Sequence, residues 1–139
     1  MIDPVLLDTN VIYAALNRRD HDHDCCVAVL NRIRRPLVTC EAVICEACFL
    51  AQGQPMAVER ILANVARRVF QIPLRLADSG TVVLELMRKY ADTPASFADA
   101  CLIAMANELG TGDILTLDSD FKHYRWRRNR AFNLLIPLD

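Results

Sequence analysis

Short apolar runs alternate along this chain with longer stretches in which apolar residues recur at helical spacing. The runs have the length of buried strands, and they lie at 5–7, 36–39, 68–72, 113–117 and 132–136. The helical stretches lie between them, at 9–16, 25–35, 41–50, 55–67, 78–90 and 97–110. Because strands that alternate with helices are typical of a parallel sheet, the pattern predicts an α/β sandwich.

Residues at the ends and on the faces of these stretches agree with this division. Asp8 follows the first strand and is placed to cap the helix after it. Ser96 stands where it would open the last helix with a capping box. Val82, Leu86 and Tyr90 recur on one helical face, and we expect that face to pack on the core.

Composition and charge exclude several classes of protein. A chain of 139 residues that is 53% hydrophobic and 24% charged fits one globular domain over residues 1–139. The net charge of -1 provides no overall basic field for nucleic acid, and the preference for arginine over lysine suits phosphate binding but is equally explained by codon bias. Without an uncharged apolar span or a signal peptide, we expect a cytoplasmic protein with no membrane partner.

The cysteines leave two interpretations open. "CEAC" at 45–48 has a C-x-x-C spacing, but no matching second pair follows it, and "HDHDCC" at 21–26 lies in an acidic stretch expected to be exposed. A zinc site at 21–26 is the less favoured interpretation. Reduced thiols that serve as small buried apolar groups are the favoured one.

Glu46 is the only charged residue in the apolar stretch "VICEACFLA" at 43–51. Removing a carboxylate from water costs roughly several kcal/mol unless a partner compensates the charge. Asp99 poses the same question, because Ile103 and Ala106 share its helical face. We therefore expect a positively charged group or ion beside each of these two carboxylates.

Acidic residues also follow the predicted strands. Asp8 comes directly after the first strand and Asp118 after the strand at 113–117. Glu46 lies early on the helix that follows the second strand, and this helix begins near the same edge of the sheet. Asp99 lies in the first turn of the helix that precedes the strand at 113–117. Since functional groups in an open parallel sheet gather at the carboxyl ends of its strands, these acids are expected to converge on one cleft.

A divalent cation would compensate such a cluster. Converging carboxylates cannot all stay ionised without a counter-charge, and no lysine or arginine lies within four residues of Glu46 or Asp99. A set of oxygen ligands without histidine or cysteine favours Mg²⁺ or Mn²⁺. Such an ion can activate water for attack on a phosphodiester.

Each acid also has a simpler interpretation. Asp8 and Asp99 could only cap helices, Asp118 could only cap a turn, and Glu46 could point into solvent. Asp120 is expected to be structural or exposed. The purely structural account becomes weak only because several such acids occur together at strand ends.

Four stretches resemble the PIN-domain nucleases, most closely the VapC-type toxins of bacterial toxin–antitoxin modules. They are "LLDTNVIYAAL", the Glu46 helix, "YADTPASFADACLIAMANELG" and "ILTLDSDFKHYR". "DTN" alone would be a weak signal, but the ordered set is specific. It covers most of the chain, although the middle matches only in pattern.

The resemblance implies a three-layer α/β/α sandwich with a central, mainly parallel sheet, and a metal-dependent endoribonuclease that leaves 5′-phosphate and 3′-hydroxyl ends. Carried over by position, the catalytic acids are Asp8, Glu46, Asp99 and Asp118, with the metal bound by Asp8, Asp99 and Asp118. Asn10 and Thr116 match polar supports beside the metal. Ser96 replaces an acid found in many relatives, which disfavours a second metal position.

RNA also has to be held by its backbone. "YRWRRNR" at 124–130 places Arg125, Arg127, Arg128 and Arg130 around Trp126. Arginine binds phosphate and an aromatic ring offers a stacking platform, so Arg125, Arg127 and Arg128 are candidate RNA-binding residues. The alternative is a solvated turn whose tryptophan is tucked into the core.

Partners and competing functions follow from the same resemblance. It implies an RNA substrate, a homodimer and a small cognate antitoxin that occupies the acidic cleft. One alternative is a doubly wound binding or signalling module, but a receiver would need adjacent acids after the first strand and a lysine after the last, where this chain has "LDTN" and "LLIPLD". Another is a catalytically idle relative that binds RNA without cleaving it.

Overall fold

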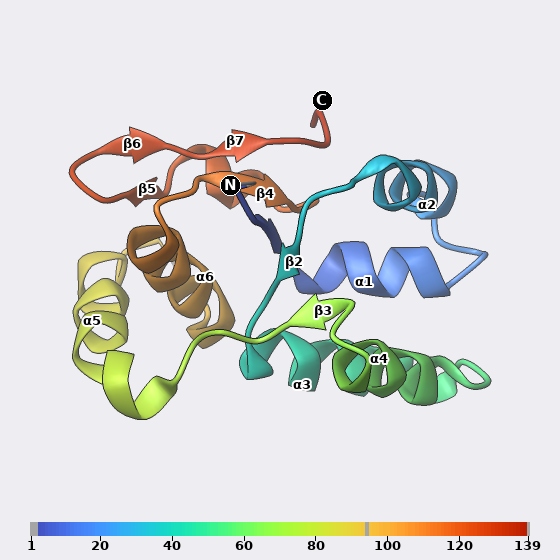
Figure 1. The fold of residues 1–139 in the computed structure, drawn as a ribbon. Helices are drawn as coiled ribbons and strands as arrows, with labels where there is room; N and C mark the ends of the chain where they lie inside the picture. The colour runs from blue at the N-terminus through green and yellow to red at the C-terminus, as the bar shows by residue number, and fades with distance from the viewer. Residues whose placement is uncertain (1–2, 94, 139) are drawn as a thin grey trace.

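Strands from distant parts of the sequence form the sheet at the centre of the molecule. In a computed structural model that describes residues 3–93 and 95–138, five strands run parallel in the order β3-β2-β1-β4-β7. They are β1 (Val5–Leu7), β2 (Leu37–Val38), β3 (Phe70–Gln71), β4 (Asp113–Leu115) and β7 (Asn133–Leu134). Each lies inside a predicted apolar run, so the α/β architecture with a central parallel sheet is confirmed (Figure 1).

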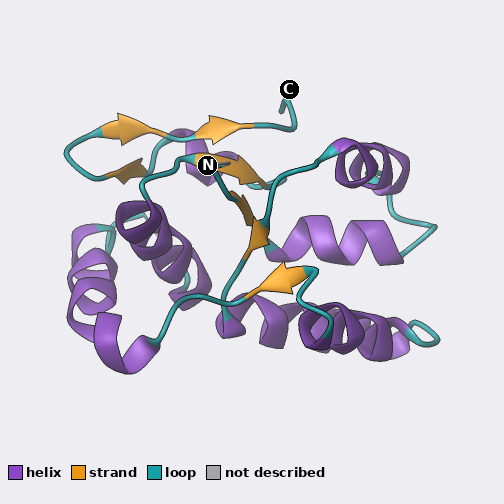
Figure 2. Ribbon diagram, in the orientation of Figure 1, coloured by secondary structure: helices purple, strands orange, loops and turns teal. Residues whose placement is uncertain are grey.

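Helices connect β1, β2, β3 and β4 in turn and cover the sheet on both sides. They are α1 (Thr9–Leu16), α2 (His23–Arg32), α3 (Glu41–Leu50), α4 (Ala57–Ala66), α5 (Leu76–Lys89) and α6 (Phe97–Leu109), with short 3-10 turns η1 (Ala51–Gly53) and η2 (Ser119–Lys122). Figures 1 and 2 show α5 and α6 on one side of the sheet and α1 and α2 on the other, which gives the expected three layers. Helix α3 packs against α1, α4 and α6.

Helix α6 is the most deeply buried helix of the described chain. Every residue from Ala98 to Ala106 is buried, because α6 lies between α5 and β1. Its alanines allow close packing, and a helix covered on all sides needs no polar stripe. The deep position of α6 also means that Asp99, near its start, is held by a rigid element.

Several local expectations differ from the structure. Helix α4 begins at Ala57, two positions after the expected start at Pro55, and Met56 before it has a left-handed φ of 62°. In α5, Val83 is buried, whereas Val82 is 42% exposed, so the prediction that Val82 faces the core was wrong. A surface helix packs on the core with one stripe, and an error of one position turns a side chain by about 100°.

The cysteines divide between the core and the surface. Cys26, Cys40 and Cys101 are buried, as the favoured interpretation expects. Cys25 and Cys45 are exposed, so they do not serve as buried apolar groups. Within residues 3–93 and 95–138, no group of three or more potential ligands at 21–26 forms a metal site.

A two-stranded antiparallel hairpin, β5 (Arg125–Trp126) and β6 (Arg130–Ala131), packs beside α6 and was not predicted. Its arginine-rich sequence has no alternating apolar pattern that could indicate strands. Trp126 anchors the hairpin: its ring is buried and its Nε1 donates to the Ala131 carbonyl over 3.1 Å. The tryptophan ring leaves no room for a side chain at Gly112.

Gly112→Ala is therefore expected to destabilise the protein by about 1–3 kcal/mol, as overpacking of a core does. A Cβ at Gly112 would lie 2.1 Å from Nε1 of Trp126, so the ring would have to move. Urea denaturation measures the change. Gly80→Ala in α5 is the matched control, because its Cβ would meet nothing within 4 Å and alanine favours a helix. Equal stabilities of the two variants would contradict the tight Gly112–Trp126 contact.

Candidate active site

The order of the strands reverses between β1 and β4. The chain proceeds from β1 to β2 and β3 on one side, and then returns to place β4 on the other side of β1. Leu7 pairs with Leu115 at the carboxyl ends of the two strands, and the Asp8 amide donates to the Leu115 carbonyl over 3.0 Å. Ligand sites in open α/β sheets form at this switch point.

Asp8 lies at the carboxyl end of β1, where it is buried and both of its carboxylate oxygens accept hydrogen bonds. It caps α1: Oδ1 accepts from the Thr9 amide at 2.8 Å, and Oδ2 accepts from the Thr116 hydroxyl at 2.6 Å. Burial raises the pKa of Asp8 to about 6, and the charges of Asp99 and Asp118 add to this rise, although the two hydrogen bonds oppose it. The site therefore confines negative charge that the protein itself does not neutralise.

Asp99 lies across the cleft in the first turn of α6. It forms the predicted capping box, in which its amide donates to Ser96 Oγ over 3.0 Å and its Oδ2 accepts from the Ser96 amide over 3.2 Å. The buried Tyr124 hydroxyl donates to the same Oδ2, also over 3.2 Å. Burial raises the pKa of Asp99, and the nearby Asp118 charge contributes to the rise.

The residues that follow β4 supply the remaining polar groups of this edge. Thr116, fully buried, accepts from the Asp118 amide over 3.0 Å while it donates to Asp8. Asp118 caps η2 by accepting from the Asp120 amide over 2.9 Å. Asn10 Oδ1 accepts from the Leu117 amide over 3.1 Å, which ties α1 to the segment after β4. Asn10 and Thr116 thus hold the backbone around the acids.

Glu46 is exposed, and this corrects the sequence interpretation. Its helix buries Val43, Ile44 and Ala47, whereas Glu46 lies on the exposed face with Phe49, which is 70% exposed. No burial cost has to be compensated. The Glu46 carboxylate still lies beside the other acids, because its Oε2 accepts a hydrogen bond from the hydroxyl of Thr9, the neighbour of Asp8, over 3.1 Å.

Together these side chains line one open cleft of about 350 Å³. Its lining residues are Asp8, Thr9, Asn10, Glu46, Leu50, Ser96, Asp99, Asp118 and Asp120. Among the described residues, no lysine or arginine lines the cleft, and none forms an ion pair with its acids. Asp120 belongs to the lining, a role that the sequence interpretation did not assign to it.

The donor set suits a hard divalent cation, although the acids are not drawn together around one point. All the charged lining groups are carboxylates, the ligands that Mg²⁺ and Mn²⁺ prefer. In the part of the chain that the structure describes, no three ligating side chains are already close enough to hold an ion. Magnesium commonly keeps several waters and only one or two direct carboxylates, so this open arrangement fits it.

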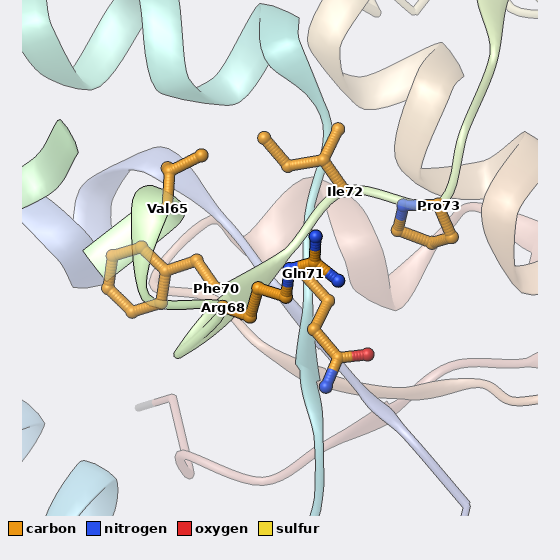
Figure 3. A pocket seen from close by; sticks show the side chains of 6 residues that line it. All are labelled: Val65, Arg68, Phe70, Gln71, Ile72 and Pro73. Atoms are coloured by element: carbon orange, nitrogen blue, oxygen red, sulfur yellow. The ribbon is translucent and has the colours of Figure 1, made fainter. Parts of the chain in front are cut away.

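The hollow shown in Figure 3 offers a different chemistry. It measures about 380 Å³ and is lined by Val65, Arg68, Phe70, Gln71, Ile72 and Pro73. These residues border β3, at the edge of the sheet and two strands from β1. The hollow contains no carboxylate, so the acidic cleft is the candidate active site.

Comparison with known proteins assigns the fold to a family. The family model of the PIN domain matches residues 5–127. The chain belongs to the PIN domain family. A solved structure to which this PIN domain is similar is that of Mycobacterium tuberculosis VapC20, a sarcin–ricin-loop-cleaving toxin. The two share 20% identity with a TM-score of 0.80, over 91% of this chain and 98% of VapC20, so the likeness concerns the fold. Comparison with curated proteins finds no match.

Two arginines of the hairpin, Arg125 and Arg127, donate hydrogen bonds within this PIN domain. Arg125 Nη1 donates to the carbonyls of 122–124, and Arg127 Nε donates to the Asn107 carbonyl over 3.1 Å. Asn107 lies about 12 Å along α6 from Asp99, given the rise of a helix. RNA binding by Arg125, Arg127 and Arg128 stays a prediction. The proposed stacking platform was wrong, because Trp126 is only 7% exposed.

Sequence reasoning missed Thr9, Asp120 and Tyr124 as parts of the site. Asp120 had a usable signal, because an acid two residues after Asp118 falls in the same turn. Thr9 is adjacent to Asp8, but its partner Glu46 is remote in sequence. Nothing in the sequence pattern indicates that Tyr124 reaches Asp99.

Proposed function

We propose that this PIN domain is a metal-dependent endoribonuclease that acts as the toxin of a toxin–antitoxin pair. The observation that carries the proposal is the convergence of Asp8, Glu46, Asp99 and Asp118 on one cleft without a basic partner among the described residues. The fold likeness to VapC20, a toxin that cleaves the sarcin–ricin loop, supports the choice of RNA.

We propose that Asp8, Asp99 and Asp118 hold the metal, one or two of them by direct contact and the rest through metal-bound water. Bound Mg²⁺ or Mn²⁺ would polarise the scissile phosphate and lower the pKa of a water molecule for in-line attack. Thr116 and Asn10 keep Asp8 and the segment after β4 in place. These hydrogen bonds fix the acids before substrate arrives, which reduces the cost of ordering the site.

Glu46 has a different proposed role. Its Oε2 accepts from Thr9, while its Oε1 has no hydrogen-bond partner among the described residues and its side chain is exposed in the cleft. Oε1 is therefore placed to take a proton from the attacking water as a general base. An exposed carboxylate can exchange that proton with solvent after each turnover.

Several exposed apolar side chains favour binding of another protein chain to this surface. Phe49, Leu50, Met56 and Leu62 are between 48% and 70% exposed, and Leu50 also lines the cleft. We propose that they contribute to contacts with a second copy or with the antitoxin, whose arginine would enter the acidic cleft. The proposed place of action is the cytoplasm. In the described part of the chain, no helix has the length and apolar character to cross a membrane.

Removal of divalent metal is expected to abolish RNA cleavage. Purified protein incubated with labelled RNA should cut it with Mg²⁺ or Mn²⁺, stop cutting with excess EDTA, and regain activity when Mn²⁺ exceeds the chelator. The products should carry 5′-phosphate ends. Cleavage that persists in EDTA would contradict the metal mechanism. Metal-dependent RNA binding without cleavage would identify an idle relative instead.

A further inference from the structure

Tyr124 is the only aromatic hydroxyl that contacts an acid of the cleft in the described chain. The residue is fully buried, and its OH lies 3.2 Å from Asp99 Oδ2. Burial, followed by the Asp99 charge, raises the pKa of Tyr124, so the phenol keeps its proton and donates it. A buried charge-assisted hydrogen bond of this kind restricts the carboxylate that accepts it.

The two oxygens of Asp99 have different surroundings. Oδ2 accepts from both the Ser96 amide and the Tyr124 hydroxyl. Oδ1 has no hydrogen-bond partner among the described residues, yet no buried polar side-chain atom of that part of the chain lacks one. Oδ1 must therefore be open to solvent, on the side of the cleft.

The segment that holds Asp118 also ends in Tyr124. The Phe121 amide donates to the Asp118 carbonyl over 3.2 Å, and the Tyr124 amide donates to the Asp120 carbonyl over 3.1 Å. These bonds close the η2 turn into a compact unit. The hydrogen bond from the Tyr124 hydroxyl to Asp99 joins this unit to α6. It therefore helps to fix the distance between Asp99 and Asp118.

Aromatic packing fixes the direction of the hydroxyl. The Tyr124 ring meets Tyr90 at 4.9 Å and Phe121 at 5.0 Å between centroids, both edge to face. Phe121 meets Phe132 in the same way at 5.3 Å. Such contacts stabilise one ring orientation. Because the ring cannot swing away, the hydroxyl holds Oδ2 in a single place.

We propose that Tyr124 is a positioning residue that holds Oδ2 of Asp99, so that Oδ1 alone faces a divalent cation and Asp99 keeps its spacing to Asp118. The inference rests on the proposed function, since it assigns Asp99 to the metal. The ligand class is a small, hard dication. Mg²⁺ demands near-ideal octahedral geometry, whereas Ca²⁺ accepts irregular arrangements. Loss of the hydroxyl should therefore weaken Mg²⁺ binding more than Ca²⁺ binding.

Titration calorimetry of Tyr124→Phe with Mg²⁺ and Ca²⁺ tests this inference. Phenylalanine keeps the ring packing and removes only the hydroxyl. We expect Kd for Mg²⁺ to rise about 10–100-fold, as it does when partners of metal ligands are removed, and Kd for Ca²⁺ to rise several-fold less. Circular dichroism checks that the variant is folded.

Tyr90→Phe is the matched control. Tyr90 belongs to the same aromatic cluster, but its hydroxyl accepts from the Arg125 amide and touches no acid. Its Kd for Mg²⁺ should stay within about twofold of the wild type, a change well below the loss expected for a ligand partner.

The outcomes separate the two proposals. Equal Mg²⁺ affinities of Tyr124→Phe and Tyr90→Phe, with normal binding by the wild type, would overturn the positioning role alone. Equal losses for Mg²⁺ and Ca²⁺ would also overturn it, because a merely structural hydroxyl has no preference between ions. A wild-type protein that binds neither ion would overturn the proposed function, and this inference with it.

Discussion

Asp99→Asn is expected to reduce RNA cleavage by about 10²–10⁴-fold, the range typical of a lost catalytic group, while the protein stays folded. Asparagine has the same shape, and its Oδ1 can accept from the Ser96 amide and the Tyr124 hydroxyl in place of Oδ2. The capping box of α6 is therefore kept. What is lost is the negative charge that faces the cleft.

Cleavage rates under single-turnover conditions, with thermal unfolding measured in parallel, check this result. Asp78→Asn is a suitable control, because Asp78 is an exposed first-turn acid of α5 that pairs only with Arg75 among the described residues. It should cleave RNA at the wild-type rate. If Asp99→Asn cleaved as fast as Asp78→Asn, the mechanism assigned to the acidic cleft would be wrong.

Asp8→Asn is expected to remove most of the loss of stability that the metal-free wild type shows as the pH rises to 8, a loss of up to about 3 kcal/mol for a carboxyl whose pKa is raised to about 6. Asparagine can accept only one of the two hydrogen bonds that Asp8 accepts, so the variant forgoes part of this gain at every pH. The folded state favours the protonated form of Asp8. Its contribution to stability is therefore fully present below 3.8, the ordinary pKa of an aspartate, and is lost as the pH rises through about 6. The raised pKa of Asp99 acts in the same direction.

Urea denaturation at pH 5 and pH 8, in EDTA and in Mg²⁺, measures this effect. In EDTA, the wild type should lose stability between the two pH values and Asp8→Asn should lose much less. Mg²⁺ should stabilise the wild type at pH 8 more than it stabilises the variant, because ligands that bind only the folded state add to its stability. A metal-free wild type that is equally stable at both pH values would show that the ionised form of Asp8 does not destabilise the folded state.

The positions of strands and helices could be predicted because burial leaves a periodic trace. β1 and α3 have the predicted bounds, Val5–Leu7 and Glu41–Leu50. Asp8 and Asp118 could be placed together because parallel strands end at one edge, and the structure brings both to the same cleft. The local pattern and the rule for strand ends contain this information.

The exposure of Glu46 could not be read from its neighbours. An apolar stretch normally indicates burial, but Phe49 and Leu50 in the same stretch are also exposed. Apolar residues that await a protein partner look the same in a sequence as residues of the core. An apolar stretch therefore does not reveal whether its residues lie in the core or on the surface.

The Tyr124–Asp99 contact and the β5–β6 hairpin were unpredictable for another reason. Both depend on tertiary geometry: the hydroxyl reaches an acid on a different element, and the hairpin is anchored by a tryptophan that fits against Gly112. Single residues that act through one long-range contact leave no periodicity. Only the assembled core reveals them.

The place of β4 in the sheet has a consequence for synthesis of the protein on the ribosome. β4 pairs with β1, and Asp118 follows β4, so Asp8 and Asp118 meet only after the segment at 113–118 has emerged. A nascent chain that ends at Gly110 already contains Asp8, Glu46 and Asp99, but it lacks Asp118 and the Thr116 hydroxyl that donates to Asp8. A ribosome can therefore make most of this chain before the acidic cleft is complete, and the proposed RNA cleavage would begin only after that.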